Sequence, residues 1–321
     1  MKAVVLDGYT LNPGDLSWEG VSSQVEEFTL YDGTPQELAA QRIGDCEIVF
    51  TNKVEITREV MEACPSVKMV GLLATGYNIV DIAEAARRGI YVCNVPSYST
   101  PSVAQMTFAL LLEIVNGVGL HDESVKAGEW TGCKTFSYWK KPQVELCGKT
   151  FGVVGFGSTG RAAAAIARAF GMEVRVYTRT QRPELLGEGM AFCTLDDLLR
   201  TSDVISLHCP LTDETRDLID ADALRRMKEG AILLNTARGA LCDEGAVADA
   251  LRAGRLAGAG FDVASVEPIA ADNPLLTAPN CFITPHIAWA TKAARSRLME
   301  VLGQNLRAFL AGEPQNVVNG L

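Results

Sequence analysis

Short runs of apolar residues alternate with segments of mixed polarity along nearly the whole chain. The apolar runs are rich in Val and Ile and are not interrupted by polar residues, a pattern typical of strands covered on both faces. We expect such strands at residues 3–6, 47–51, 67–73, 90–93, 150–155, 173–178, 203–208, 231–236 and 281–284. Helical patterns lie between them, at residues 59–63, 79–88, 161–170, 196–201, 221–228 and 243–253. This rhythm predicts an α/β protein with two doubly wound parallel sheets.

Two helical patterns are longer than the crossover of an ordinary strand–helix–strand unit. They cover residues 101–117 and 290–310, and we interpret both as helices that join two domains. Residues 128–146 follow the first of them and carry several aromatic side chains without a regular period. Two interpretations of this loop stay open: a contact surface, or a loop folded onto its own domain.

Composition and net charge limit the kinds of molecule that the protein is expected to bind. The chain has 321 residues, which favours two domains, and 48% of them are hydrophobic. Its formal net charge is −10. Because an acidic surface repels phosphate backbones and anionic lipids, we expect neither nucleic acid nor a membrane as a partner.

The cysteines favour a reducing compartment. Nine are scattered along the chain without a CxxC spacing, and only three histidines accompany them. We therefore expect reduced cysteines, no metal site and a cytoplasmic location. The apolar run at residues 3–6 is too short for a signal peptide.

A glycine-rich turn follows the strand expected at residues 150–155. It reads Gly155-Phe156-Gly157-Ser158-Thr159-Gly160 and precedes an alanine-rich helix. The first glycine permits the turn, the second lets the backbone approach a pyrophosphate, and the third lets helix and strand pack closely. With a strand before it and a helix and strand after it, this turn predicts a dinucleotide-binding domain.

The end of the next strand bears on the choice between NAD and NADP. A site that prefers NAD usually has an acidic residue there for the ribose 2′-hydroxyl, whereas this chain has Thr178 followed by Arg179 and, three residues on, Arg182. Arginines at this place suit a 2′-phosphate, so we expect NAD or NADP with a preference for NADP. The alternative is that these arginines are solvated loop charges.

Three polar segments follow later strands of the same domain, and they contain Arg238, Glu267 and His286. Each has an ordinary explanation by itself: a charge at a helix end, a loop carboxylate, and a core histidine. The carboxyl ends of parallel strands meet at the edge of the sheet where ligands bind. We therefore expect the three side chains to lie together beside the nicotinamide.

These segments, in this order, resemble the D-isomer-specific 2-hydroxyacid dehydrogenase family. The resemblance includes residues 73–78, 94–96 and 207–212, and it covers almost the whole chain. Residues 7–15 and 138–142 are most similar to the hydroxypyruvate reductase, or glycerate dehydrogenase, branch.

The resemblance implies roles for the site residues. Arg238 would hold the substrate carboxylate and carbonyl oxygen, His286 would exchange a proton with that oxygen, and Glu267 would orient the imidazole. Asp262 would bind the nicotinamide carboxamide. The nicotinamide and ribose would be lined by Cys209, Thr215, Thr236 and Ala237, and the substrate carboxylate would accept backbone N–H groups of Ala74, Thr75 and Gly76.

The resemblance also implies how the chain is divided into domains and how it assembles. A flavodoxin-like substrate-binding domain of residues 1–98 and 288–321 would be interrupted by a Rossmann domain of residues 99–287. Closure of the two domains would exclude water from the reaction. The protein would form a homodimer, with residues 128–146 as an arm on the partner, and Trp139 is a candidate to reach the neighbouring site.

The function expected on this basis is hydride transfer between NAD(P)H and a small 2-keto acid. The substrate that we expect first is hydroxypyruvate or glyoxylate, and the product is then D-glycerate or glycolate. Two alternatives stay open: another D-2-hydroxyacid dehydrogenase with a lactate-like or phosphoglycerate-like substrate, and a non-catalytic NAD(H)-sensing protein of the same fold.

Overall fold

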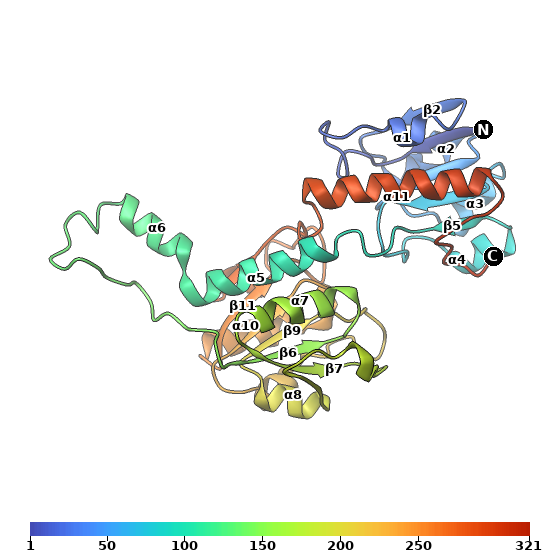
Figure 1. Ribbon diagram of the computed structural model, residues 1–321. Coiled ribbons are helices and arrows are strands. Elements are labelled where there is room, and N and C mark those ends of the chain that lie inside the picture. Colours follow the sequence, from blue (N-terminus) through green and yellow to red (C-terminus); the bar gives the residue numbers. More distant parts are fainter. The chain divides into compact units, whose positions relative to one another are not determined.

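The computed structural model describes residues 1–321 and divides into two compact units (Figure 1). The first unit comprises Met1–Ser99 and Ala290–Leu321, and the second comprises Thr100–Trp289. The chain thus leaves the first unit after residue 99 and returns to it at residue 290. From the sequence we expected these crossings at residues 98/99 and 287/288.

The first unit is built on a five-stranded parallel sheet with the order β2-β1-β3-β4-β5, the order of flavodoxin-like folds. Its strands are β1 (Lys2–Val5), β2 (Glu27–Leu30), β3 (Ile48–Thr51), β4 (Met69–Leu72) and β5 (Tyr91–Cys93). Its helices are α1 (Glu19–Ser22), α2 (Ala39–Ile43), α3 (Arg58–Ala63), α4 (Ile82–Arg87) and α11 (Lys292–Leu310), with a 3₁₀ turn η1 (Gln36–Leu38). Every residue of β3 and β4 is buried, as expected for strands covered on both faces.

The second unit is built on a seven-stranded parallel sheet with the order β12-β11-β10-β9-β6-β7-β8. Its strands are β6 (Thr150–Val154), β7 (Glu173–Tyr177), β8 (Met190–Phe192), β9 (Val204–Leu207), β10 (Ala231–Asn235), β11 (Leu256–Phe261) and β12 (Cys281–Ile283). The strand order reverses between β6 and β9. In sheets of this kind, ligands bind outside the carboxyl ends of the strands at such a reversal.

Helices cover both faces of this sheet. They are α5 (Thr100–Asn116), α6 (Val118–Lys126), α7 (Ser158–Ala169), α8 (Leu195–Thr201), α9 (Ala221–Arg226) and α10 (Glu244–Arg252), with 3₁₀ turns η2 (Pro183–Leu185), η3 (Gly239–Leu241) and η4 (Pro274–Thr277). One hydrophobic core contains side chains of α5 and α7, and a second contains side chains of α8, α9 and α10. Figure 1 shows α7 and α8 on opposite sides of β6 and β7. The expectation of two doubly wound parallel sheets is confirmed.

Three strands were missed by the pattern of apolar runs. β2 and β8 are short edge strands without a buried residue, so their hydrophobic signal is weak. β11 reads Leu-Ala-Gly-Ala-Gly-Phe, and its glycines resemble a turn in the sequence. The structure explains them, because a Cβ atom at Gly258 would lie 2.5 Å from Ile114 of α5, and one at Gly260 would lie 2.9 Å from Leu110. Close packing of α5 on the sheet therefore requires glycine there.

Residues 117–146 form an arm that projects from the second unit (Figure 1). The left-handed Gly117 starts α6, and an irregular segment leads back to the sheet. The indole Nε1 of Trp130 donates to the Phe136 carbonyl at 2.9 Å, and the Tyr138 hydroxyl lies 2.7 Å from that of Ser124 on α6. The arm is thus partly folded on itself, yet Phe136 is 92% exposed. No single helix is long and apolar enough to cross a membrane; α5 and α6 reach that length and composition only as a pair bent by 57°.

Candidate active site

The turn after β6 has the geometry of a dinucleotide cradle. Gly155 has a φ of +93°, and a Cβ atom there would lie 2.7 Å from the Cys209 backbone nitrogen. At Gly160 a Cβ atom would overlap the Gly155 carbonyl, so only glycine lets α7 approach the strand. At Gly157 a Cβ atom would meet nothing within 4 Å, which leaves open space beside the backbone. The turn and the first residues of α7, Ser158 and Thr159, therefore fit a pyrophosphate at the helix N-terminus.

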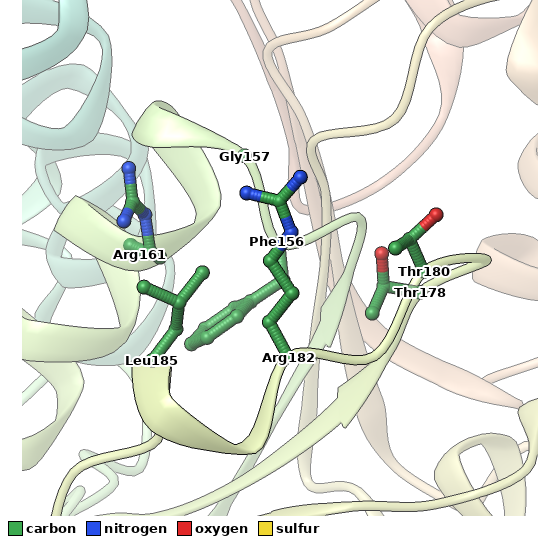
Figure 2. Close-up of a pocket in the computed structure, with 7 residues that line it drawn as sticks. All are labelled: Phe156, Gly157, Arg161, Thr178, Thr180, Arg182 and Leu185. Atoms are coloured by element: carbon green, nitrogen blue, oxygen red, sulfur yellow. The ribbon is translucent and has the colours of Figure 1, made fainter.

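A hollow of about 310 Å³ adjoins this turn (Figure 2). It is lined by Phe156 and Gly157 of the turn, Arg161 of α7, Thr178 and Thr180 after β7, and Arg182 and Leu185 at η2. Thr178 is thus where the sequence places it, at the end of the second strand of the domain. Arg179 is exposed and is not among the lining residues. Sequence reasoning missed Arg161, because its position inside a helix carries no sign of the loop that it faces.

The segment after β9 supports the back of the glycine turn. The His208 backbone amide donates to the Val154 carbonyl at 2.7 Å, and the imidazole Nε2 atom of His208 lies 2.8 Å from the Ser206 hydroxyl. Burial lowers the pKa of His208 to about 4 and raises that of the Cys209 thiol to about 11, so both side chains are neutral near pH 7. The Thr215 hydroxyl donates to the Pro210 carbonyl at 2.8 Å and thereby closes the following turn.

Arg238 lies on a loop that is shaped by a buried asparagine at the end of β10. The Asn235 side chain accepts from the Ala237 amide at 3.1 Å and donates to the Arg238 carbonyl at 2.9 Å. These bonds turn the Arg238 side chain outward, where it is exposed and donates to the Ala237 carbonyl at 2.7 Å. The Thr236 hydroxyl points the other way and lies 3.1 Å from that of Thr107 on α5.

Gly239 brings the Arg238 loop against the loop that carries Glu267. A Cβ atom at this glycine would overlap the backbone of Ala264 and Ser265. The two backbones therefore touch at a place where no other residue fits. The glycine after Arg238 is the sequence signal for this contact, although the sequence does not show what it contacts.

Glu267 and His286 form a hydrogen-bonded pair. The Nδ1 atom of His286 lies 2.6 Å from the Glu267 Oε2 atom, and both side chains are about one third exposed. The second carboxylate oxygen, Oε1, accepts from the Ala264 amide at 3.1 Å. The carboxylate is thus held between its own loop and the Nδ1 side of the imidazole.

A buried aspartate fixes the loop of His286. The Asp262 carboxylate accepts from the Thr284 hydroxyl at 2.5 Å and from the amides of Ile287 at 3.0 Å and Ala288 at 2.8 Å. Burial raises the pKa of Asp262, while these donors oppose that effect. The residue has no exposed surface. Its observed partners all belong to the segment of residues 284–288, and the expected contact with a nicotinamide carboxamide stays a prediction.

His286 itself adopts a left-handed backbone with a φ of +55°, which is uncommon for a residue other than glycine. The bonds to Asp262 flank it on both sides, and the Trp289 indole donates to the His286 carbonyl at 2.8 Å. Backbones of this kind persist where the surroundings fix them, and they concentrate at functional sites.

Glu244 is a further support that sequence reasoning missed. This buried residue begins α10 and accepts from the Ser265 amide at 2.7 Å, the Ser265 hydroxyl at 2.6 Å and the Asn273 side chain at 2.8 Å. It thereby holds the loop that leads to Glu267. In the sequence it looks like an ordinary acidic residue in the first turn of a helix.

The three residues expected at the substrate carboxylate lie in the first unit, directly after β4. The Thr75 hydroxyl donates to the Val95 carbonyl at 2.7 Å, and the Ala74 carbonyl accepts from the Val95 amide at 3.0 Å. The Asn94 side chain donates to the Thr75 carbonyl at 2.7 Å. The segment Ala74–Gly76 is thus tied to the end of β5, with its own side chains partly or fully exposed.

Together, the second unit places an imidazole–carboxylate pair and an exposed guanidinium on loops that touch one another. All of these loops follow the carboxyl ends of β10, β11 and β12, in the same sheet as the dinucleotide cradle. No group of three or more His, Cys, Asp or Glu side chains is placed to hold a metal, and all nine cysteines are free. The arrangement suits proton transfer to an oxygen beside a bound anion.

Comparison with known proteins agrees with this geometry. Residues 108–288 match the family model described as D-isomer specific 2-hydroxyacid dehydrogenase, NAD binding domain. The chain is 49% identical to a hydroxypyruvate reductase of Blautia hydrogenotrophica, over 99% of this chain and 100% of that one. It is 37% identical to a glycerate dehydrogenase of Methylorubrum extorquens, over 94% and 97% of the two chains. An acyclic imino acid reductase, solved in complex with NADPH and D-Arg, superposes with a TM-score of 0.87 at 30% identity, over 99% and 100% of the two chains.

Proposed function

Because the chain belongs to the D-isomer specific 2-hydroxyacid dehydrogenase family, we propose that it reduces hydroxypyruvate or glyoxylate to D-glycerate or glycolate. It is an oxidoreductase that uses a nicotinamide cofactor. The observation that carries the proposal is the His286–Glu267 pair at 2.6 Å, on a loop network shared with Arg238 and beside a dinucleotide cradle. The similarity to a hydroxypyruvate reductase and a glycerate dehydrogenase supports this choice of substrate.

Each side chain has one task in this reaction. A bound reduced nicotinamide supplies the hydride. Arg238 binds the substrate carboxylate through its planar, permanently charged guanidinium. The protonated His286 gives its Nε2 proton to the carbonyl oxygen, and in the oxidative direction the neutral ring takes that proton back. Glu267 holds the Nδ1 side of the ring, so that Nε2 points at the oxygen.

The test is the reduction of four keto acids, hydroxypyruvate, glyoxylate, pyruvate and 3-phosphohydroxypyruvate, followed by absorbance at 340 nm with NADH and with NADPH. We expect hydroxypyruvate or glyoxylate to give the highest kcat/KM. A preference for pyruvate or the phosphorylated acid would replace the proposed substrate. Cofactor binding without turnover of any of the four would favour the sensing protein.

The same assay tests the roles of two residues. We expect His286→Gln to lower kcat by at least about 100-fold, because the general acid is lost, while the Kd of the cofactor stays the same. Arg238→Ala should raise KM for the keto acid as well as lower kcat, because a charge-assisted bond to the carboxylate is lost. Normal turnover of the first variant, or an unchanged KM in the second, would contradict the assigned role.

We also propose that the cofactor is NADP(H) in preference to NAD(H). Thr178 stands where an acidic residue would repel a 2′-phosphate, and two arginines line the hollow beside it. One neighbour of similar structure was solved with NADPH. The 340 nm assay ranks the two cofactors directly, and a higher kcat/KM with NADH would overturn the preference.

The proposed assembly is a homodimer in the cytoplasm, with the arm of residues 117–146 on the partner. Support comes from the arm's exposed apolar side chains, which are Val118, Leu120, Val125, Trp130, Phe136, Trp139 and Val144. The acidic net charge of −10 and the nine free cysteines support a cytoplasmic protein that binds neither nucleic acid nor a membrane.

A further inference from the structure

We propose that His121 is a pH-sensitive switch in the arm: its neutral imidazole holds segment 138–141 against α6, and protonation of the ring releases this segment. His121 is one of three histidines in the chain and lies near the start of α6. The other two, His208 and His286, belong to the candidate active site. The consequence of the switch for assembly rests on the proposed homodimer, whereas the switch itself does not.

The imidazole of His121 bridges two parts of the arm that are distant in the chain. Its Nδ1 atom lies 2.6 Å from the carbonyl oxygen of Gly117, and its Nε2 atom accepts from the backbone amide of Lys140 at 3.1 Å. A carbonyl oxygen can only accept and an amide N–H can only donate. The hydrogen of the ring is therefore on Nδ1, and both bonds require the neutral form.

Protonation is incompatible with one of these two bonds. Histidine is the side chain whose charge ordinarily changes between pH 5 and 8. A protonated ring carries a hydrogen on both nitrogens, so Nε2 would present an N–H group to the N–H group of Lys140. The bond to Gly117 would persist, because Nδ1 is the donor in both forms. Protonation thus breaks the contact with segment 138–141 and keeps the contact with the start of α6.

No carboxylate is placed to compensate for the added charge. The charged side chains on the surrounding elements are Glu113 on α5, Asp122, Glu123 and Lys126 on α6, and Glu129, Lys140 and Lys141 beyond it. All except Glu123 already have partners among themselves or on the backbone. Residues two positions apart on a helix do not face each other, so Glu123 does not face the ring. A proton on His121 therefore gains no ion pair.

The bond from His121 is the contact that fixes the backbone of segment 138–141. Three other contacts of this segment use side chains only. They are Tyr138 with Ser124 at 2.7 Å, Lys140 with Glu129 at 2.6 Å, and Lys141 with the Ile114 carbonyl at 2.6 Å. Loss of the amide bond therefore lets the backbone of the segment move while its side chains stay tethered.

This backbone carries a side chain of the proposed dimer contact. Trp139 lies inside the segment and is 71% exposed. At neutral pH the partner would meet a segment of fixed shape, whereas at acidic pH it would have to order the segment on binding. Because ordering costs conformational entropy, we expect the dimer to weaken as the pH falls.

The first experiment determines the state of the ring in the whole protein. We label histidine with ¹⁵N and record long-range ¹H–¹⁵N spectra at pH 7.5 and 5.5, with His121→Gln to identify the His121 signals. We expect the Nδ1–H form at pH 7.5 and the doubly protonated ring at pH 5.5. An Nε2–H form at pH 7.5, or a ring that stays neutral at pH 5.5, would overturn the switch.

The second experiment follows the backbone by hydrogen exchange of peptides that cover segment 138–141, corrected for the intrinsic effect of pH. We expect protection in the wild type to fall by about 5-fold or more between pH 7.5 and 5.5, because a hydrogen bond is lost. In His121→Gln, which does not titrate, protection should be equal at both pH values. The same fall in the variant as in the wild type would overturn the switch.

Tyr138→Phe is the matched control, because it removes one hydrogen bond of the same segment without removing a titrating group. Protection should be lower at both pH values, and the ratio between them should equal that of the wild type. A ratio of one in this variant would show that His121 does not cause the pH dependence.

Sedimentation equilibrium at the same two pH values tests the consequence for assembly. We expect the dimer Kd of the wild type to rise by about 10-fold at pH 5.5, because two arms each lose a bond, and that of His121→Gln to rise less. Equal rises would overturn the link between the switch and the dimer. Failure of the proposed homodimer looks different: the protein would be monomeric at both pH values, while the hydrogen exchange would still depend on pH and on His121.

Discussion

Thr178 occupies the position where dinucleotide-binding domains that prefer NAD usually carry an acidic residue. It lies at the end of β7 and lines the hollow that also contains Arg161 and Arg182. A carboxylate at this place would accept from a ribose hydroxyl, and it would repel a phosphate and neutralise an arginine.

We therefore expect Thr178→Asp to reverse the proposed preference for NADP(H). The Kd of NADPH should rise by about 10-fold or more, and that of NADH should fall, because the new carboxylate accepts from the 2′-hydroxyl. Quenching of protein fluorescence by each cofactor measures both values. Thr178→Asn, which has the same shape without the charge, is the control; an equal effect of both variants would show that shape and not charge decides.

His208 links the stability of the second unit to pH. Its pKa is lowered by burial from 6.5 to about 4, so the folded protein keeps the ring neutral where the unfolded chain protonates it. The stability that this group confers is fully present above pH 6.5. It is lost as the pH falls toward 4, by about 1.4 kcal/mol per pH unit within that window.

The measurement is urea unfolding of the wild type and of His208→Gln at pH 7, 6 and 5. The amide of the variant still offers a partner to Ser206, yet it does not titrate. We expect the free energy of unfolding to fall less steeply toward low pH in the variant. Parallel slopes for the two proteins would assign the loss to carboxylates elsewhere.

At the scale of elements, the candidate site is a set of loops held by buried polar groups. Asn235 shapes the loop after β10, Glu244 at the start of α10 holds the loop after β11, and Asp262 holds the loop after β12. Each buried group makes at least two hydrogen bonds to backbone or side-chain groups of its loop, which favours one conformation of that loop. The loops could otherwise move independently, and the pair His286–Glu267 would be lost.

Gly239 tests this organisation, because its contact joins two of the loops. We expect Gly239→Ala to push the Arg238 loop away from Ala264 and to lower kcat/KM for the keto acid by about 10-fold or more, while cofactor binding is kept. The free energy of unfolding should fall by about 1–3 kcal/mol through overpacking.

The control is Gly33→Ala, at a glycine where a Cβ atom meets nothing within 4 Å. This variant should behave as the wild type in both measurements. If Gly239→Ala also left kcat/KM and the free energy of unfolding unchanged, the positions of the two loops would not depend on their contact.

At the scale of the whole molecule, the chain forms two units. It passes from the first unit to the second after Ser99 and returns to the first at Ala290. The second unit also carries the arm, on which three apolar side chains of α6 are exposed: Val118, Leu120 and Val125. Exposed apolar side chains gathered on one element are typical of a surface that is covered in the working assembly.

We expect Val118→Asp with Leu120→Asp to convert the proposed dimer into monomers, because two charges would be buried in its interface. Light scattering after size-exclusion chromatography gives the mass, for which the monomer value is 34.5 kDa. Asp222→Lys, on the exposed α9, is the control for a change of surface charge. A wild type that is already monomeric would refute the proposed dimer.

The sequence by itself determined the fold class and the residues worth examining. Unalternated apolar runs predict strands covered on both faces, and glycines between a strand and an alanine-rich helix predict a dinucleotide turn; both signals come from local chemistry. The sequence did not predict the edge strands β2 and β8, the glycine-bearing β11 or the role of Arg161, because residues distant in the chain make their environments. Only the tertiary structure decided that Asp262 holds the His286 loop, that Gly239 joins two loops, and that Arg161 and Arg182 share one hollow, since each is a contact across the fold.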